Sequence, residues 1–173
     1  FCPKAQRSTS WRAFSEPDPT ESIRWLSDAL EGFDQRLGSV LLSLRASLER
    51  DDATLERALA AWPTSVPLAL ELLPPSWQER AVRERASAHG VTLVATDLEG
   101  RDEPELHEGA GFTYLRLRRD AYSPADVERW ARRLEPRLEA GTDAYVFFRH
   151  DDDGQMALNA EAMLARLRAF TAA

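Results

Sequence analysis

The sequence predicts an α/β fold in which parallel strands are joined by helices. Helix and strand patterns alternate at least four times over 173 residues, and the strand segments are apolar runs typical of parallel sheets. The length suits a single domain over residues 1–173. A doubly wound sheet and a TIM-barrel-like (β/α) arrangement both remain open, because periodicity alone does not separate them. The chain has neither a Gly-x-Gly-x-x-Gly fingerprint nor a P-loop, so the sequence indicates no cofactor.

The first helix with a clear start signal is expected at Asp18. Asp18 is the predicted N-cap, and Pro19 takes the favoured first helical position. An apolar stripe with spacings of three and four residues then runs over 23–37, and Gly38 ends it. Residues 40–44 follow as a short buried strand.

The same cycle is then expected to repeat twice. Asp51 or Asp52 caps the next helix, which Pro63 ends. The predicted strand at 68–72 precedes a helix from Ser76 to His89, and a third apolar run covers 91–96.

The last third of the chain carries the strongest helix start. A strand is predicted over 112–117, and Ser123 with Asp126 forms a capping-box pattern. Pro136 is expected to kink or end that helix. A further strand is predicted over 144–148, and the terminal helix is marked by Leu158, Leu164, Leu167 and Phe170.

The composition limits which binding partners and which cellular compartment we expect. The 22 Lys and Arg against 29 Asp and Glu give a net charge of −7, which disfavours non-specific binding to nucleic acid and to anionic membranes. No apolar run approaches the roughly 18–20 residues that span a bilayer. Cys2 is the single cysteine, which excludes an intrachain disulfide and a cysteine-based zinc site. We therefore expect a cytoplasmic protein.

Three segments carry a family resemblance: ALELLPPSW at 69–77, YLRL at 114–117 and YVFFRHD at 145–151. Their order and spacing resemble the YecE-like family, domain of unknown function 72. The resemblance implies a TIM-barrel-like fold and no established biochemical activity. It also implies that Phe1 to Lys4 end the third strand and that the first two strand–helix units are missing, since a TIM barrel has about 250 residues. An incomplete barrel exposes strand edges, so the chain is expected to be poorly soluble alone or oligomeric.

The sequence departs from the pattern of that family at two motifs. At the position of the usual Glu-x-Arg-His motif this sequence has Glu71, but Leu73 and Pro74 stand in place of the Arg and the His. At the position of the usual Thr-His pair, Ser10 stands in place of the His. These substitutions remove groups able to transfer protons. They support the alternative of a non-catalytic binding or scaffold protein.

Candidate site residues follow from the alternation within each strand. Leu115 and Leu117 suit the helix-facing side, which turns Arg116 and Arg118 to the opposite, inward side. The same rule turns Glu71 inward. It also places Arg45, Asp97, Arg149 and Asp151 inward, although the strand before Asp97 is apolar on both faces and leaves that residue ambiguous. Glu71 and Arg116 are the candidate catalytic residues because alternate barrel strands share a layer, and Lys4 falls in that layer.

Two interpretations of these residues stay open. In the first interpretation, Glu71 and Arg116 form a buried ion pair. In the second, the site binds a small anion: Arg116, Arg118 or Arg149 holds a phosphate or carboxylate, and Glu71 orients the bound group or acts as a base. Lys4 and Asp97 complete the expected ligand-binding set. An enzyme of this kind would catalyse hydrolysis or lyase chemistry on a phosphorylated or nucleic-acid-derived substrate.

His150 and the three acids after it carry the residue types of a metal cluster. Three adjacent acids before Gly154 are more typical of a solvated turn that precedes a helix. No metal is expected there.

Overall fold

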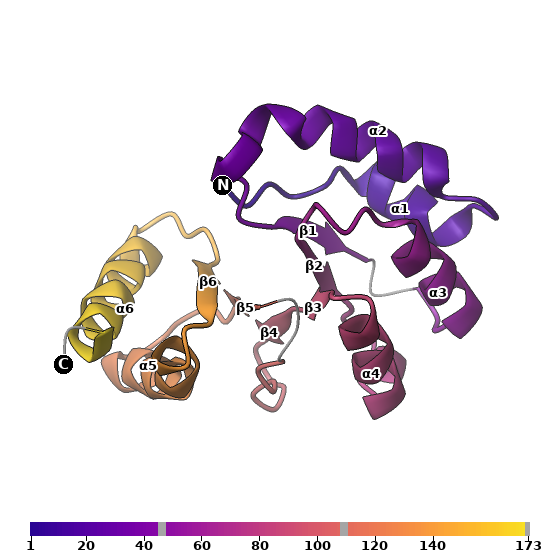
Figure 1. The fold of residues 1–173 in the computed structure, drawn as a ribbon. Helices are drawn as coiled ribbons and strands as arrows, with labels where there is room; N and C mark the ends of the chain where they lie inside the picture. The colour runs from indigo at the N-terminus through magenta and orange to yellow at the C-terminus, as the bar shows by residue number, and fades with distance from the viewer. Residues whose placement is uncertain (45–47, 108–110, 172–173) are drawn as a thin grey trace. The chain divides into compact units, whose positions relative to one another are not determined.

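The computed structural model describes residues 1–44, 48–107 and 111–171, which form two compact units (Figure 1). Of the described residues, 1–94 and 107 belong to unit 1, and 95–106 and 111–171 belong to unit 2. Each unit has its own three-stranded parallel sheet and its own hydrophobic cluster. The α/β class with parallel strands is therefore confirmed, and both sheets are open.

Unit 1 contains the first three labelled strands, in the sheet order β1-β2-β3. Lys4 adds an isolated parallel bridge to Leu41 of β1. The elements in chain order are α1 (Arg7–Ser15), α2 (Thr20–Leu30), η1 (Glu31–Arg36), β1 (Val40–Ser43), α3 (Asp52–Ala61), β2 (Leu68–Glu71), η2 (Pro75–Trp77), α4 (Arg80–Ala88) and β3 (Thr92–Leu93).

The helix starts of unit 1 follow the predicted caps with small shifts. The carboxylate of Asp51 accepts hydrogen bonds from the N–H groups of Ala53 and Thr54, which confirms it as the N-cap of α3. The Asp18 carboxylate accepts from the N–H of Thr20, but Pro19 holds the cap position, one residue later than predicted. The predicted helix from Ser76 is interrupted, because a short 3₁₀ turn, η2, precedes α4.

One face of the unit 1 sheet forms the core with the helices. Leu68 and Leu70 of β2 point to this face, as their alternation predicts, and both are at most 3% exposed. Residues of the opposite parity, such as Ala69 and Glu71, lie on the other face. The core packed against the helices therefore lies on one face of the sheet, and Glu71, at the end of β2, lies on the other.

Unit 2 contains the sheet β4-β5-β6 and two long helices. The predicted strand over 91–96 is divided at Val94: β3 pairs with β2 in one sheet, and β4 pairs with β5 in the other. The elements in chain order are β4 (Ala95–Asp97), β5 (Phe112–Leu117), α5 (Pro124–Glu139), β6 (Asp143–Phe148) and α6 (Gln155–Thr171).

The capping box of α5 forms as predicted. The Ser123 Oγ accepts from the N–H of Asp126 at 3.2 Å, and the Asp126 carboxylate accepts from the N–H of Ser123 at 2.8 Å. These contacts, with Arg129, lower the pKa of Asp126 to about 2. The helix does not end at Pro136 but continues to Glu139.

The terminal helix forms as predicted, but the residues that marked it differ in burial: Leu167 and Phe170 pack against the hydrophobic cluster of unit 2. Leu158 and Leu164 are 57% and 47% exposed, whereas Met156, Asn159 and Met163 are buried. Apolar residues occur on several sides of this helix, so its leucines alone did not indicate which face is buried. No helix within the described ranges is long and apolar enough to cross a membrane.

Candidate functional site

Glu71 ends β2 on the sheet face opposite the unit 1 core. It lies beside Ser43 in the parallel register, and the Ser43 Oγ donates a hydrogen bond of 2.5 Å to Glu71 Oε2. Glu71 is only 1% exposed. The strand ends of β1 and β2 therefore hold a buried carboxyl group whose hydroxyl partner comes from the neighbouring strand.

The other unit 1 candidates lie on or near the same face. Lys4 pairs with Leu41, two residues before Ser43, and its side chain is exposed. Arg45 lies outside the described residues. Glu71 belongs to unit 1 and Arg116 to unit 2, so their meeting in one layer stays a prediction.

Three arginines occupy the carboxyl ends of β5 and β6 in unit 2. Arg116 lies within β5, and Arg118 and Arg149 directly follow β5 and β6. The N–H of Arg149 donates to the carbonyl of Leu117 at 2.8 Å, so the strand pairing continues by one residue. By alternation, all three side chains start from the face opposite Leu115 and Leu117.

The three arginines differ in their surroundings. Arg116 is half-buried, and Arg118 is exposed. Arg149 forms an ion pair with Asp120, a residue of the loop after β5. Arg118 makes no ion pair within the part of the chain that the structure describes. The strand edge thus presents cationic groups, and Arg149 among them is partly neutralised by Asp120.

Aromatic side chains line the same sheet face below the arginines. The ring centroids of Tyr114 and Phe147 are 5.0 Å apart in a stacked arrangement, and those of Phe112 and Tyr145 are 5.4 Å apart, edge to face. Phe147 lies beside Arg116 in the register and is 37% exposed. This face can therefore offer apolar contact next to positive charge.

Asp97 does not lie with the arginines. It is level with Leu117 in the register, which places it on the helix-facing side of β4, and it is fully buried. Arg119 Nη2 lies 2.8 Å from Asp97 Oδ1, and the Tyr122 hydroxyl donates to Oδ2 at 2.9 Å. The sequence left the orientation of Asp97 ambiguous, and the register now assigns it to the opposite side from the expected one.

Sequence reasoning did not name Arg119 or Tyr122 as site residues. The backbone N–H of Arg119 donates to the Tyr122 hydroxyl at 3.1 Å, so the two residues and Asp97 form one closed network. Burial raises the pKa of Tyr122. An acidic residue at a strand end, followed in the next β–α loop by Arg and Tyr, is the signal that was available.

The acidic stretch after β6 caps a helix. The Asp151 carboxylate accepts from the N–H of Met156 in the first turn of α6 at 3.0 Å. His150 Nε2 lies 3.9 Å from Asp152 Oδ1, with both side chains almost fully exposed. Within residues 1–44, 48–107 and 111–171, no three His, Cys, Asp or Glu side chains gather as a metal site would need.

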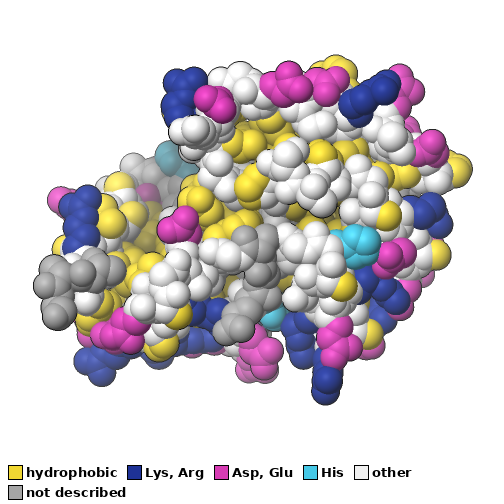
Figure 2. Space-filling view, viewed as in Figure 1, with side chains coloured by type: hydrophobic (Ala, Val, Ile, Leu, Met, Phe, Trp, Pro, Cys, Tyr) yellow, Lys and Arg dark blue, Asp and Glu magenta, His cyan; other side chains and the backbone are white. Residues whose placement is uncertain are grey.

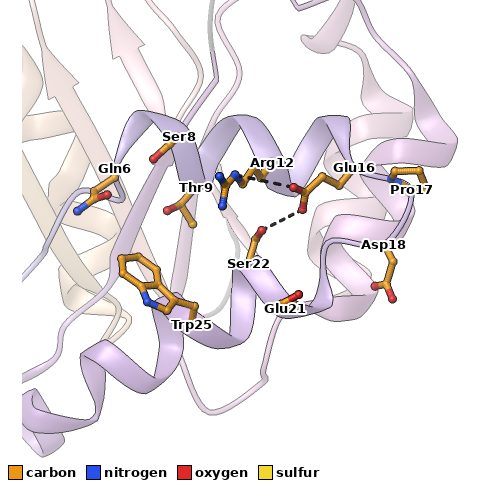
Figure 3. A pocket seen from close by; sticks show the side chains of 10 residues that line it. All are labelled: Gln6, Ser8, Thr9, Arg12, Glu16, Pro17, Asp18, Glu21, Ser22 and Trp25. Atoms are coloured by element: carbon orange, nitrogen blue, oxygen red, sulfur yellow. Dashed lines mark hydrogen bonds and ion pairs between the residues drawn. The ribbon is translucent and has the colours of Figure 1, made fainter.

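A groove of about 760 Å³ lies between α1 and α2 (Figure 3). Glu16 lines the groove and contacts both helices: its carboxylate lies 3.8 Å from Arg12 of α1 and accepts a hydrogen bond of 2.9 Å from Ser22 of α2. Trp25 lines the groove and is 56% exposed. None of the predicted site residues that the structure describes lines this groove. On the face drawn in Figure 2, acidic and basic side chains are interspersed rather than gathered by sign.

These features define an α/β protein with parallel strands and a cationic edge at the strand ends. The chain belongs to the family described as protein of unknown function DUF72, whose model matches residues 1–173. No curated protein matches it.

Solved structures of two DUF72 family proteins resemble this fold. The protein from Thermotoga maritima has a TM-score of 0.69 at 21% sequence identity, and the match covers 95% of this chain and 72% of that one. The protein from Enterococcus faecalis V583 has a TM-score of 0.75 at 17% identity, with 97% and 78% covered. At these identities the likeness concerns the fold alone.

Proposed function

We propose that this protein binds a small anion bearing a phosphate or carboxylate group at the carboxyl ends of β5 and β6. The observation that carries the proposal is the placement of Arg116, Arg118 and Arg149 on one face of two adjacent parallel strands. Guanidinium groups bind carboxylates and phosphates through two parallel hydrogen bonds, so adjacent arginines suit an anion well.

We further propose that the two sheets are consecutive parts of one (β/α) barrel. The strand pairings support this, because within each sheet the strand order follows the order of the chain: Lys4, β1, β2 and β3 in one sheet, and β4, β5 and β6 in the other. A doubly wound sheet instead reverses its order at a switch point. In a barrel, β3 and β4 are two halves of one strand that pairs with β2 on one side and with β5 on the other.

This arrangement adds Glu71 to the proposed site. Active sites of (β/α) barrels lie at the carboxyl ends of the strands, and alternate strands contribute to one layer. Lys4, Glu71 and Arg116 come from alternate strands in this order. Glu71 would then act as acid or base in hydrolysis or lyase chemistry on the bound anion, with Arg116 stabilising charge.

A non-catalytic binding protein is the second candidate. Glu71 is buried and already accepts a short hydrogen bond from Ser43, as a structural carboxyl group does. Leu73 and Pro74 add no ionisable side chain near it in sequence. Anion binding is common to both candidates, so it is the property to test first.

The test is a thermal shift titration of the 173-residue chain with inorganic phosphate, pyrophosphate and citrate. We expect at least one of them to raise the midpoint of unfolding, since a ligand at about 100 times its Kd adds roughly 2.7 kcal/mol of stability. The double variant Arg118→Gln, Arg149→Gln should lose the response. Arg132→Gln is the matched control, because Arg132 on α5 is exposed and pairs with Glu128. An equal response of the double variant and the wild type would refute the proposal.

A further inference from the structure

A small cavity lies at the carboxyl end of β1, within unit 1. Its volume is about 10 Å³, which is room for one water molecule. The residues that line it are Arg7, Ser10, Trp11 and Phe14 of α1, with Ser43, Leu44 and Leu48.

Ser10 gives this cavity an unsatisfied polar group. Its side chain is 2% exposed, and its Oγ has no hydrogen-bond partner within the described part of the chain. A buried hydroxyl without a partner is costly, and an ordered water is the usual remedy. The lining position of Ser10 makes the cavity the place where such a water would bind.

Ser43 supplies the second polar contact. Its hydroxyl hydrogen is directed at Glu71, with 2.5 Å between the oxygens. A hydroxyl also has two lone pairs, so the Ser43 Oγ can accept a hydrogen bond from a molecule in the cavity while it donates to Glu71. The cavity is thereby connected to a buried carboxylate through one serine.

We propose that the cavity holds one water molecule between Ser10 Oγ and Ser43 Oγ, and that Ser43 connects this water to Glu71 as a hydrogen-bond relay. The water O–H donates to Ser43 Oγ, and the Ser43 hydroxyl donates to the Glu71 carboxylate. Each oxygen keeps its own protons, so the chain sets the hydrogen bonding of Glu71 without separating charge.

This inference rests on the acid–base role that the proposed function gives to Glu71. It names the molecule to which Glu71 would be hydrogen-bonded through Ser43. Its test does not involve the arginines of unit 2. The proposals of a water site and of an anion site can therefore be contradicted separately.

High-resolution crystal structures of the 173-residue chain test the water site. We expect one ordered water within hydrogen-bond distance of both Ser10 Oγ and Ser43 Oγ. In Ser10→Thr, the added methyl group should occupy that space and expel the water, and Ser10→Ala should remove one of its two contacts. Ser39→Ala is the matched control, because the buried Ser39 Oγ likewise has no partner among the described residues, while Ser39 does not line this cavity. An empty cavity in the wild type, or a water that contacts neither serine, would overturn the proposal.

Infrared spectroscopy tests the relay. The carboxyl bands of Glu71 are identified by difference against Glu71→Gln. They should shift in Ser10→Thr, which keeps the Ser43 contact but removes the water, and stay unchanged in Ser39→Ala. Bands that do not respond to loss of the water would overturn the relay. A retained phosphate response in Ser10→Thr would show that the anion site is independent of this result.

Discussion

Tyr122 donates a hydrogen bond of 2.9 Å to Asp97, a carboxylate that precedes it by 25 residues. Arg119 binds the other oxygen of the same carboxylate. The β–α loop after β5 is therefore fixed to the end of β4 on the helix-facing side. That loop contains Arg118 on one side of the network and Ser123, the cap of α5, on the other.

Asp97→Ala should destabilise the fold strongly. The substitution leaves Arg119 and the Tyr122 hydroxyl without their shared acceptor, and breaking a buried ion pair from one side costs about 3–5 kcal/mol. Urea unfolding measures the difference. Asp102→Ala, at an exposed position of the same loop region, should change stability by no more than about 0.5 kcal/mol. A loss below about 1 kcal/mol in Asp97→Ala would contradict the structural role assigned to the network.

Stability should fall at alkaline pH because of Tyr122. Its pKa in the folded protein is raised by burial, whereas an unfolded tyrosine ionises near pH 10. Above about pH 10 the unfolded chain loses this proton and the folded chain keeps it, so the contribution is full below pH 10 and declines as pH rises. We expect the stability difference between wild type and Tyr122→Phe to shrink from pH 9 to pH 11. A constant difference over this range would show that Tyr122 ionises as it does in the unfolded chain.

Ser123→Ala should cost about 1 kcal/mol, because the N–H of Asp126 loses its acceptor at the start of α5. Thermal or urea unfolding gives the value. Ser87→Ala on the exposed face of α4 is the control and should not lower stability, since alanine is the better helix former. Anion binding should be unchanged in Ser123→Ala. Loss of binding without loss of stability would mean that this cap belongs to the site.

Arg116→Leu separates the structural and the functional interpretation of Glu71 and Arg116. If the two form a buried pair, the variant should lose about 3–5 kcal/mol, and replacing both residues with leucine should recover much of the loss. If Arg116 serves an anion site, phosphate binding should disappear at a modest cost in stability. Unfolding and phosphate titration of the single and double variants distinguish the two results.

Alternation within strands predicted which side chains form the core, because one face of each sheet packs on helices. Leu68, Leu70, Leu115 and Leu117 lie where their parity indicates. The same rule was ambiguous for the run over 91–96, since both of its faces are apolar. The division at Val94 and the orientation of Asp97 therefore appear only once the strand partners are known.

The local sequence pattern could not predict the contacts of the site that join residues far apart in the chain. The hydrogen bond between Ser43 and Glu71 depends on the register of two strands, and the network of Asp97 depends on the path of a loop. Hydrophobic periodicity reports neither. Cap signals lie within four residues of sequence, which is why Ser123 was identified correctly and the cap of α3 was narrowed to Asp51 or Asp52, of which Asp51 is the cap.

The Asp97 network also affects the entropy change when an anion binds. The loop that begins at Arg118 is ordered by Arg119 and Tyr122 before any anion arrives, so its backbone freedom is lost during folding and not during binding. Preorganised contacts leave more of the interaction energy as affinity. Disconnecting the loop in Tyr122→Phe should therefore make phosphate binding entropically less favourable, although Tyr122 lies on the other side of the sheet from the arginines.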